Sequence, residues 1–434
     1  MSDSCDIAIV GAGAAGMTAA IFAAEAARAD GGPAPRIVLL DGAKSPGAKI
    51  LVSGGGRCNV THDHICPDDF NGPKNIVRNV LAAFNEKAAE QWMESIGVQL
   101  KREETGKLFP VSDSARTVLA SLQRRLAELN VHTRAGCKVV GVDPTFHLEC
   151  EVSTGPSSSP DSRATAVLSA RRLILSTGGK SLPKTGSDGG GWNLARRLGH
   201  SVTDTWPALV PLVLDDRMFH ADVSGLSHDA ELSTFVEGRL NDRRTGSLLW
   251  THFGISGPLA MDASRFWTIA KGRSQAVEMR CSFVPGEAFE KVEAKLIRMA
   301  QARPKQSIVK ALCEWLPERL SAALLGHAGA EAGEALAQLS RDRRRRIVHA
   351  LTALPLPIAR DRGWNYAEVT AGGVPLDEVD FRTMASRKMP GLFLAGEILD
   401  CDGRIGGFNF QWAWATGYLA GRGAVKGLAQ SNFP

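Results

Sequence analysis

The sequence lacks the cysteine and histidine patterns that bind metals or carry disulfide redox chemistry. Its eight cysteines are scattered without CxxC or CxxxxC spacing, and its ten histidines include no pair at a convincing metal-ligand spacing. Zinc sites and redox-active dithiols need their ligands or thiols at short, fixed spacings. We therefore predict no metal site and expect the thiols to stay reduced.

Long apolar runs and a strong charge of one sign are also missing. No apolar run reaches the ~20 residues that cross a bilayer, and no charged, hydrophobic and cleavage regions of a signal peptide precede the first apolar segment. The net charge of +5 is mild for 434 residues and indicates no acidic partner by itself. We expect a soluble, cytoplasmic protein of two or three domains, without a membrane partner.

The sequence opens instead with the pattern of a dinucleotide-binding unit. The apolar run Cys5–Val10 predicts a strand, and it is followed by the turn Gly11-Ala12-Gly13-Ala14-Ala15-Gly16 and an alanine-rich helix, Met17–Ala29. A second apolar run, Ile37–Leu40, predicts another strand and ends on Asp41. A GxGxxG turn between a strand and a helix, with an acid after the next strand, is typical of sites for the ADP half of a dinucleotide.

Each residue of this pattern has a physical role. Gly11 permits the tight turn, Gly13 lets backbone N–H groups approach a pyrophosphate, and Gly16 lets the helix pack closely on the strand. The helix N-terminus then faces the phosphates. Asp41 stands 25 residues after Gly16 and can accept hydrogen bonds from the 2′- and 3′-hydroxyls of a ribose. A free 2′-hydroxyl favours FAD or NAD over NADP, and both remain open at this point.

The rest of the first half continues an α/β pattern. Helical periodicity and short apolar runs alternate after a glycine-rich loop at 45–59, and a buried strand leads into the glycine turn at Thr177. The expected helices cover 75–97 and 113–129. The expected strands cover 138–142, 148–152, 164–168 and 172–176, with a turn at 155–162.

A different pattern begins near Ser201 and predicts an insert. Short alternating runs at 209–214, 229–236, 247–251 and 276–283 indicate a small antiparallel barrel or sheet, and a helical block follows. A buried strand at 391–395 and a helix at 408–419 return to the first pattern. We therefore predict a discontinuous Rossmann-like domain (1–200 and 362–434), an inserted β-barrel domain (201–286 and 354–361) and a helical subdomain (287–353).

Four further glycine-rich turns make the pattern specific. They are Ser53-Gly54-Gly55-Gly56-Arg57-Cys58-Asn59, Thr177–Gly191, Thr251–Pro258 and Gly396–Trp412. With its SGGGRCN and DGRIGGFNFQWAWATG strings, nearly the whole chain resembles the HI0933-like family of bacterial flavoproteins, the group of the YhiN and BaiN proteins, which is related to aminoacetone oxidases. The resemblance implies non-covalent FAD in a two-part Rossmann-like domain of an α/β fold, with the inserted antiparallel barrel and the helical subdomain over the flavin.

The chemistry of a flavin agrees with these turns. Its ring needs backbone N–H groups close to its plane, and glycines allow that approach. Gly406 and Gly407 precede an apolar helix whose N-terminus can stabilise negative charge on the N1–C2=O edge. The resemblance also implies an acid near the ribityl chain, Glu397, Asp400 or Asp402, and the alternative for that acid is an N-cap or turn carboxylate.

The predicted cofactor-binding residues lie in these turns. They are Gly11, Gly13, Ala14, Ala15, Gly16, Asp41, Gly42, Lys49, Ser53, Gly54, Gly55, Gly56, Arg57, Cys58, Asn59, Thr177, Gly178, Gly179, Gly396, Glu397, Asp402, Gly403, Gly406, Gly407, Phe408 and Asn409.

Two side chains are candidates for catalysis. His252 stands in a glycine-rich turn of the predicted barrel, and histidine is the usual acid or base near neutral pH. The alternative role for His252 is to make a structural hydrogen bond. Arg57, with Asn59, suits the flavin pyrimidine edge or a substrate anion, and its alternative is to stabilise its own turn. Cys58 has no thiol partner at disulfide-reductase spacing, so we expect an inert small side chain.

The sequence contains no second GxGxxG turn that would indicate a separate NAD(P)H domain. Our leading hypothesis is an FAD-dependent oxidoreductase, a reductase with NAD(P)H as partner or an amine or ketone oxidase. It would transfer a hydride at flavin N5 to or from a small organic substrate between flavin and insert. One alternative is an RNA-acting flavoprotein that uses the basic run Arg341–Arg346, and another is a flavin-binding protein without turnover. We expect no nucleic-acid partner, because the default for such a run is a solvated helix face. We expect a monomer, because no segment has the pattern of a large exposed apolar helix.

The glycine turn generates a direct test. Purified protein should be yellow, with the absorbance bands of oxidised flavin, and Gly13→Val should abolish them because the added side chain occupies the space of the pyrophosphate. Absorbance spectroscopy of the purified proteins measures this. Colourless wild-type protein that takes up no added FAD would contradict the assignment.

Overall fold

The computed structural model describes residues 3–29, 31, 34–153 and 163–428. The chain divides into two compact units, Met1–Thr205 with Glu368–Pro434 (unit 1) and Trp206–Ala367 (unit 2). Each unit has its own hydrophobic core. The unit boundaries lie a few residues after the predicted ones, and the predicted split of the insert into barrel and helical subdomain stays a prediction. The turn predicted at 155–162 lies outside the described residues.

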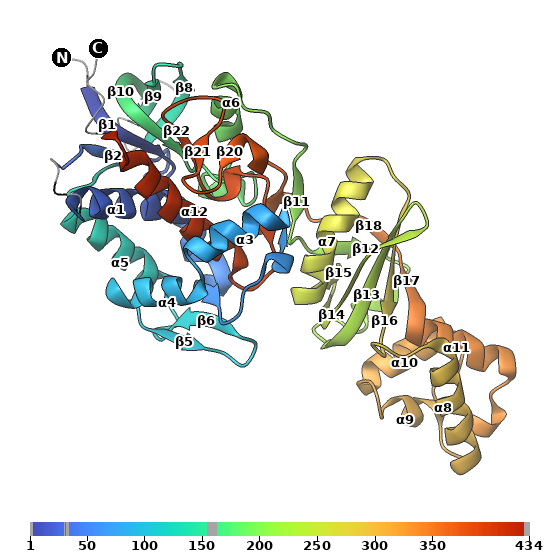
Figure 1. Cartoon of the computed structure of the whole chain (residues 1–434). Helices are drawn as coiled ribbons and strands as arrows, with labels where there is room; N and C mark the ends of the chain where they lie inside the picture. Colours follow the sequence, from blue (N-terminus) through green and yellow to red (C-terminus); the bar gives the residue numbers. More distant parts are fainter. Residues whose placement is uncertain (1–2, 30, 32–33, 154–162, 429–434) are drawn as a thin grey trace. The chain divides into compact units, whose positions relative to one another are not determined.

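A parallel sheet forms the centre of unit 1 (Figure 1). Its parallel strands run in the order β22-β10-β1-β2-β7, and an antiparallel pair, β20 and β21, extends the edge beside β22. Strands that are buried on both faces read as continuous apolar runs, and Ile37–Leu40 is such a run. The strands are β1 (Asp3–Val10), β2 (Ile37–Leu40), β7 (His132–Arg134), β10 (Arg163–Leu175), β20 (Val379–Asp380), β21 (Ala385–Ser386) and β22 (Leu392–Leu394).

Strand β10 differs from its prediction because it joins two expected strands into one. Its first half pairs antiparallel with β9 (His147–Ser153), which in turn pairs with β8 (Cys137–Val142). Its second half pairs in parallel with β1. The polar stretch Ser169–Arg172 interrupts the apolar pattern, but its backbone groups are paired with β1, and Arg171 forms an ion pair with Asp6 at 3.0 Å. Backbone pairing therefore continues the strand where the side-chain pattern predicted a break.

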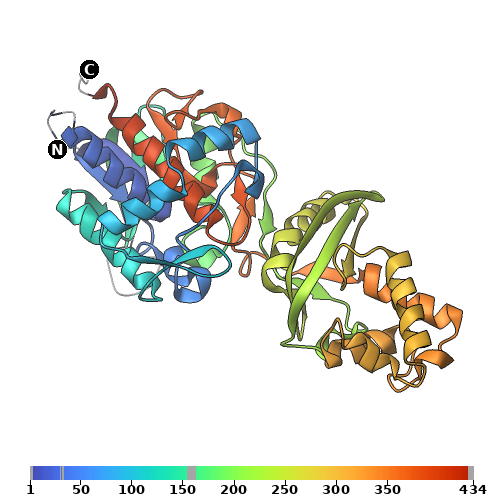
Figure 2. The ribbon, with the colours of Figure 1, turned by 60° about the horizontal axis from the view of Figure 1, so that its bottom comes forward.

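The N-terminal and C-terminal helices of unit 1 lie side by side, dark blue and dark red in Figures 1 and 2. They are α1 (Ala14–Ala29) and α12 (Phe408–Val425), which extends beyond the predicted 408–419. A Cβ at Gly417 would lie 2.6 Å from the carbonyl oxygen of Ala15, and one at Gly421 would lie 2.3 Å from that of Ala19. Glycine is therefore required for the backbones to approach this closely.

The other helices of unit 1 surround the sheet and its loops. The single helix predicted over 75–97 is two helices, because Asn85 caps the second by accepting a hydrogen bond from the N–H of Ala88 at 2.9 Å. The helices are α2 (Ala48–Val52), α3 (Lys74–Ala83), α4 (Glu86–Ser95), α5 (Ala115–Glu128) and α6 (Gly190–Arg197). The short strands are β3 (Thr61–His62), β4 (Phe70–Asn71), β5 (Leu100–Arg102), β6 (Lys107–Pro110), β19 (Val369–Ala371) and β23 (Asp402–Gly403).

An antiparallel sheet forms the first part of unit 2, in the order β17-β16-β13-β14-β15-β12-β18. The two strands at the ends of this order are consecutive in the chain and separated by Pro357 alone, so the sheet closes on itself through 354–361. The strands are β12 (Leu212–Leu214), β13 (Ser227–Val236), β14 (Arg239–Thr251), β15 (Gly254–Ser256), β16 (Val277–Ser282), β17 (Leu354–Leu356) and β18 (Ile358–Asp361). The short strand β11 (Trp206–Ala208) begins the unit.

Helices supply the rest of unit 2. Helix α7 follows β15 directly, so the predicted turn 251–258 contains a hairpin turn, a short strand and a helix start. The later helices share one hydrophobic core with the sheet, which includes the buried Trp250 and Leu320. The helices are α7 (Gly257–Gly272), α8 (Phe289–Ala302), α9 (Ile308–Leu312), α10 (Glu318–His327) and α11 (Arg341–Ala353).

The close contact between α1 and α12 predicts a position-specific effect of adding one methyl group. Gly421→Ala should destabilise unit 1 by ~1–3 kcal/mol, because its Cβ meets backbone atoms that cannot rotate away. The matched control is Gly326→Ala in α10, where a Cβ meets no atom within 4 Å. Alanine suits a helix better than glycine, so the control should be neutral or slightly stabilising. Urea unfolding measures both, and equal midpoints for the two variants would contradict the packing argument.

Candidate functional site

Four predicted site segments follow strands that end at the same level of the sheet in unit 1. Val10 pairs with both Leu40 and Leu175, and Leu175 pairs with Leu394. All these strands are parallel, so the segments that begin at Gly11, Asp41, Ser176 and Ala395 leave one edge of the sheet together. Ligands of open α/β sheets bind at this edge, beyond the carboxyl ends of the strands.

The first glycine turn combines two tight contacts with one open position. Gly11 has a φ of 102°, and a Cβ there would lie 2.5 Å from the carbonyl oxygen of Ser176. A Cβ at Gly16 would lie 1.8 Å from the carbonyl oxygen of Gly11. A Cβ at Gly13, in contrast, would meet no described atom within 4 Å. The fold itself needs glycine at positions 11 and 16, whereas the space beside Gly13 is open for a ligand.

Asp41 fixes this turn to the end of β2. Its carboxylate accepts hydrogen bonds from the N–H groups of Ala12 and Ala43, each at 2.7 Å. The side chain is half-buried, and each carboxylate oxygen has a second lone pair for a further donor. Its predicted role as acceptor for ribose hydroxyls stays a prediction. Gly42 is packed against Lys138, whose Cβ would lie 3.1 Å from an added Cβ.

The second glycine turn holds three consecutive residues in the left-handed region. Gly54, Gly55 and Gly56 have φ values of 55°, 68° and 85°. A Cβ at Gly55 would meet nothing within 4 Å, whereas one at Gly54 would meet the backbone nitrogen of Asn59 at 3.0 Å. The turn is closed by a hydrogen bond from the N–H of Cys58 to the carbonyl oxygen of Ser53 at 3.1 Å. It therefore presents backbone rather than side chains on its open side.

Arg57 is held by the protein's own groups. Its guanidinium donates to the Glu103 carboxylate at 2.6 Å and lies 3.9 Å from the centre of the Phe109 ring. These contacts support the alternative in which Arg57 stabilises its turn. A role toward a cofactor or substrate stays a prediction, because the half-buried guanidinium has further N–H groups to donate.

Cys58 is fully buried and has a φ of 61°, a strained value for a residue with a side chain. Burial raises the pKa of its thiol to about 12, against a smaller lowering by a hydrogen bond with Ser53. A thiol with this pKa stays protonated at neutral pH and is a poor nucleophile.

Lys49 and Glu397 form the centre of a polar cluster. The Lys49 ammonium donates to Glu397 and to Ser181, each at 2.6 Å. The other oxygen of Glu397 accepts from the Ser181 hydroxyl and the N–H of Thr370, both at 2.9 Å. The cluster therefore connects three predicted site loops to β19. Sequence reasoning missed Ser181 and Thr370; Ser181 stands two residues after Gly179, but Thr370 lies outside every glycine-rich turn.

The C-terminal turn is fixed by its own side chains and ends at a helix N-terminus. The Asn409 amide accepts from the N–H of Gly403 at 2.8 Å and donates to its carbonyl at 2.9 Å. Gly407 precedes α12 with a φ of 97°, and a Cβ there would lie 2.7 Å from the backbone of Thr61. No side chain among the described residues caps α12, so the first N–H groups of this helix stay available to an acceptor on a ligand.

The other two candidate acids of this turn have protein partners. Asp402 is buried and accepts a hydrogen bond from the Asn71 amide at 2.8 Å, and Asp400 accepts one from the Thr203 hydroxyl at 3.0 Å. Among the three acids considered for the ribityl chain, Glu397 alone lies in the cluster with Lys49.

Ten buried side-chain polar atoms have no hydrogen-bond partner within the described residues, and two of the ten belong to predicted site turns. These two are Oδ1 of Asn59 and Oγ1 of Thr177. Buried polar atoms in folded proteins are usually paired, so these two have hydrogen-bonding capacity that a bound ligand can use. Together with the open space at Gly13, they fit a bound dinucleotide.

His62 contacts a predicted site residue, Phe408, but was not itself predicted from the sequence. Its ring stacks on Phe408, with centroids 5.0 Å apart, and its Nε2 lies 3.0 Å from the carbonyl oxygen of Thr105. Its Nδ1 lies 3.0 Å from the Asp63 carboxylate. The only signal in the sequence was its place three residues after the SGGGRCN string.

His252 belongs to unit 2. It is exposed in the turn between β14 and β15, and its ring meets that of Phe253 edge-on at 5.2 Å. Its predicted catalytic role stays a prediction.

The basic run on α11 is largely engaged within unit 2. Arg343 donates twice to Glu334, at 2.7 and 2.8 Å, and Arg344 forms an ion pair with Glu293 at 3.3 Å. Arg346 donates to the carbonyl oxygen of Ala328 at 3.0 Å. These three side chains connect α11 to its neighbours. Their interactions partly neutralise the positive charge that is available to bind RNA.

The described residues contain no helix that is both long and apolar enough to cross a membrane. Within the same part of the chain, no group of three or more His, Cys, Asp or Glu side chains could hold a metal ion.

Comparisons with known proteins find similarity over nearly the whole chain. The family model described as HI0933-like protein Rossmann domain matches residues 5–423. The 3-dehydro-bile acid delta(4,6)-reductase of Clostridium scindens is 34% identical over 426 residues, which cover 97% of this chain and 99% of that protein. The ribosomal RNA dihydrouridine synthase of Escherichia coli is 31% identical over 431 residues, which cover 97% of this chain and 98% of that protein.

Solved structures agree with the fold. The 3-ketosteroid delta1-dehydrogenase from Sterolibacterium denitrificans, in complex with 1,4-androstadiene-3,17-dione, is similar with a TM-score of 0.52 and 12% identity. The match covers 99% of this chain and 100% of that one. At this identity the likeness concerns the fold alone.

The burial of Cys58 generates a labelling prediction. At about pH 8 a pKa of about 12 leaves a thiolate fraction on the order of 10⁻⁴, so a maleimide should not label Cys58 in the folded protein. Cys313 is exposed and should be labelled first. Peptide mapping by mass spectrometry, with guanidinium-unfolded protein as control, measures both sites. Equal labelling rates for the two cysteines in folded protein would contradict the inert thiol.

Proposed function

Because the chain belongs to the HI0933-like family, we propose that it is an FAD-dependent oxidoreductase that reduces a carbon–carbon double bond conjugated to a carbonyl group. The full-length similarity to two named enzymes carries this proposal. One name describes a reductase of a 3-oxo compound with double bonds, and the other describes the formation of dihydrouridine. The uracil double bond that is lost in dihydrouridine is also conjugated to a carbonyl, so both names imply the same class of reaction.

The residues of unit 1 support FAD as the cofactor. The turn Gly11–Gly16 and Asp41 would hold the pyrophosphate and the adenosine ribose. The unpaired atoms of Asn59 and Thr177 and the backbone of Gly54–Gly56 would face the remainder of the cofactor. When bound, FAD supplies an N5 atom that accepts a hydride from a reductant and gives it to the substrate.

The chain's own groups have three tasks in such a reaction. The N-terminus of α12 would stabilise negative charge near the pyrimidine edge of the cofactor. The Lys49–Glu397 cluster keeps the loops after β10 and β22 in place. A proton must also reach the carbon next to the carbonyl, and His252 and Arg57 stay our candidates to donate or orient it.

NAD(P)H is the proposed reductant. Since the sequence contains no second GxGxxG turn, we propose that the nicotinamide and the substrate use one binding space in turn. Steady-state kinetics should then show a ping-pong pattern.

Two substrate classes fit this reaction. A small enone is the first, in line with the leading sequence hypothesis and with the named reductase. Uridine in RNA is the second, and the similarity to the E. coli enzyme favours it. The arginines of α11 are not the proposed RNA contact, because most of them have partners inside unit 2.

Anaerobic reduction followed at the flavin band tests the reaction. NADH or NADPH should bleach the band, and addition of a cyclic enone or a uridine oligonucleotide should restore it. The product should be heavier than the substrate by two hydrogen atoms, as measured by mass spectrometry. A saturated ketone is the matched control and should restore nothing. Bleaching by amines alone, with no response to NAD(P)H, would contradict the reductase and indicate an oxidase.

A further inference from the structure

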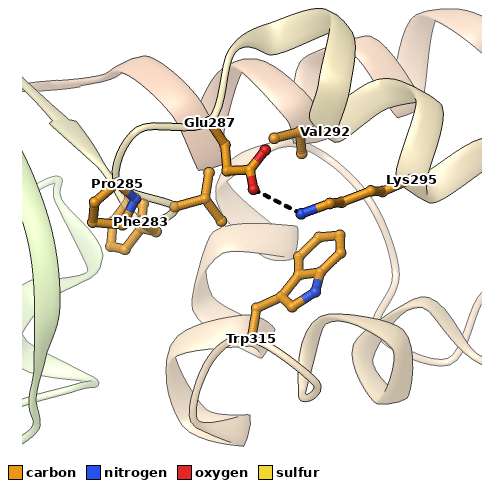
Figure 3. A pocket seen from close by; sticks show the side chains of 7 residues that line it. Phe283, Pro285, Glu287, Val292, Lys295 and Trp315 are labelled. Atoms are coloured by element: carbon orange, nitrogen blue, oxygen red, sulfur yellow. Dashed lines mark hydrogen bonds and ion pairs between the residues drawn. The ribbon is translucent and has the colours of Figure 1, made fainter.

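Unit 2 contains a pocket of about 280 Å³ that the proposed reaction does not use (Figure 3). The segment after β16 contributes Phe283 and Pro285, and α8 contributes Val292. Phe283 and Val292 are buried, so they form an apolar floor. The indole of Trp315, which follows α9, forms another wall. The pocket therefore offers a flat aromatic surface beside aliphatic groups.

An ion pair supplies polar groups beside these apolar walls. The Lys295 ammonium donates to the Glu287 carboxylate at 2.9 Å and lies 5.9 Å from the centre of the Trp315 ring. Lys291 approaches the other carboxylate oxygen at 3.2 Å. Hydrogen bonds from these lysines hold the pKa of Glu287 below its ordinary value, so the carboxylate stays ionised at neutral pH. Two ammonium groups and one carboxylate leave a net positive charge at this wall.

The positive charge continues along α8. Lys291, Lys295 and Arg298 stand at positions i, i+4 and i+7, which lie on one face of a helix. The Lys291 side chain is 64% exposed, and Arg298 is also exposed. Between residues 287 and 353 the chain has twelve Lys and Arg against eight Asp and Glu. The basic face of α8 is thus adjacent to the pocket, because Lys295 belongs to both.

We propose that this pocket binds an unstacked nucleobase of single-stranded RNA, with the neighbouring phosphates on the basic face of α8. A nucleobase has a flat apolar face and a polar edge, which match the indole and the Lys295–Glu287 pair. Lys295 can donate to a base carbonyl, and Glu287 can accept from a ring N–H. This inference rests on the RNA substrate class of the proposed function and adds a site that holds the RNA apart from the reacting uridine.

Binding of a fluorescein-labelled oligouridine of about twelve nucleotides, followed by anisotropy with the full-length protein, tests the site. Trp315→Ala should weaken binding about 5- to 150-fold, the range that stacking of one base on an aromatic ring gives. Trp315→Phe keeps an aromatic face and should restore most of the affinity. Lys291→Gln should weaken binding and reduce its dependence on salt, because one phosphate contact is lost.

Matched controls separate the site from general effects of mutation. Tyr366→Ala removes an exposed aromatic ring elsewhere in unit 2, and Lys271→Gln removes a basic side chain at the end of α7. Both should bind the oligonucleotide like the wild type. Circular dichroism checks that all variants are folded. If Trp315→Ala is unfolded, the result for Lys291→Gln still decides the test.

The binding assay contains no reductant, so its result is independent of turnover. Failure of the reductase proposal would appear as absent product from enone and RNA alike, with oligonucleotide binding intact. The inference itself is overturned if the wild type binds no oligouridine at low salt. It is also overturned if Trp315→Ala and Lys291→Gln bind like the wild type.

Discussion

The candidate site depends on the register of four parallel strands in unit 1. Because Val10, Leu40, Leu175 and Leu394 stand level with one another, four loops that are distant in the sequence leave the sheet at one edge. Hydrogen bonds between the backbones of neighbouring strands set this arrangement. A few polar side chains are then enough to connect the loops, since the sheet has already brought the loops together.

Close backbone approach is the second constraint on unit 1. Gly16, Gly417 and Gly421 leave no room for a Cβ because α1 packs directly on its neighbours, whereas the space at Gly13 and Gly55 is open. Glycines of the same turn therefore serve different purposes. Some are needed by the fold, and others expose backbone to a ligand, which agrees with the unpaired polar atoms of Asn59 and Thr177.

Charge in unit 2 is distributed differently from what the sequence suggests. The run Arg341–Arg346 is the densest basic segment, but its middle arginines hold α11 to α8 and to the segment around Glu334. The lysines of α8 are spaced along the helix and attract less notice in the sequence. Lys295 lies beside Trp315, and the exposed Lys291 stands one turn before it, which makes this face the better candidate for contact with a polyanion.

The sequence by itself determined the α/β fold, the first strand–turn–helix unit and the glycine-rich turns, because these depend on local periodicity and on backbone angles that glycine alone adopts easily. It also indicated the family, which the full-length match confirmed. Only the tertiary structure decided that β10 is one strand, that Arg57 is held by Glu103, and that Ser181 and Thr370 join Lys49 and Glu397. Such contacts join residues up to 348 positions apart, and no local pattern records which side chains will meet across that separation.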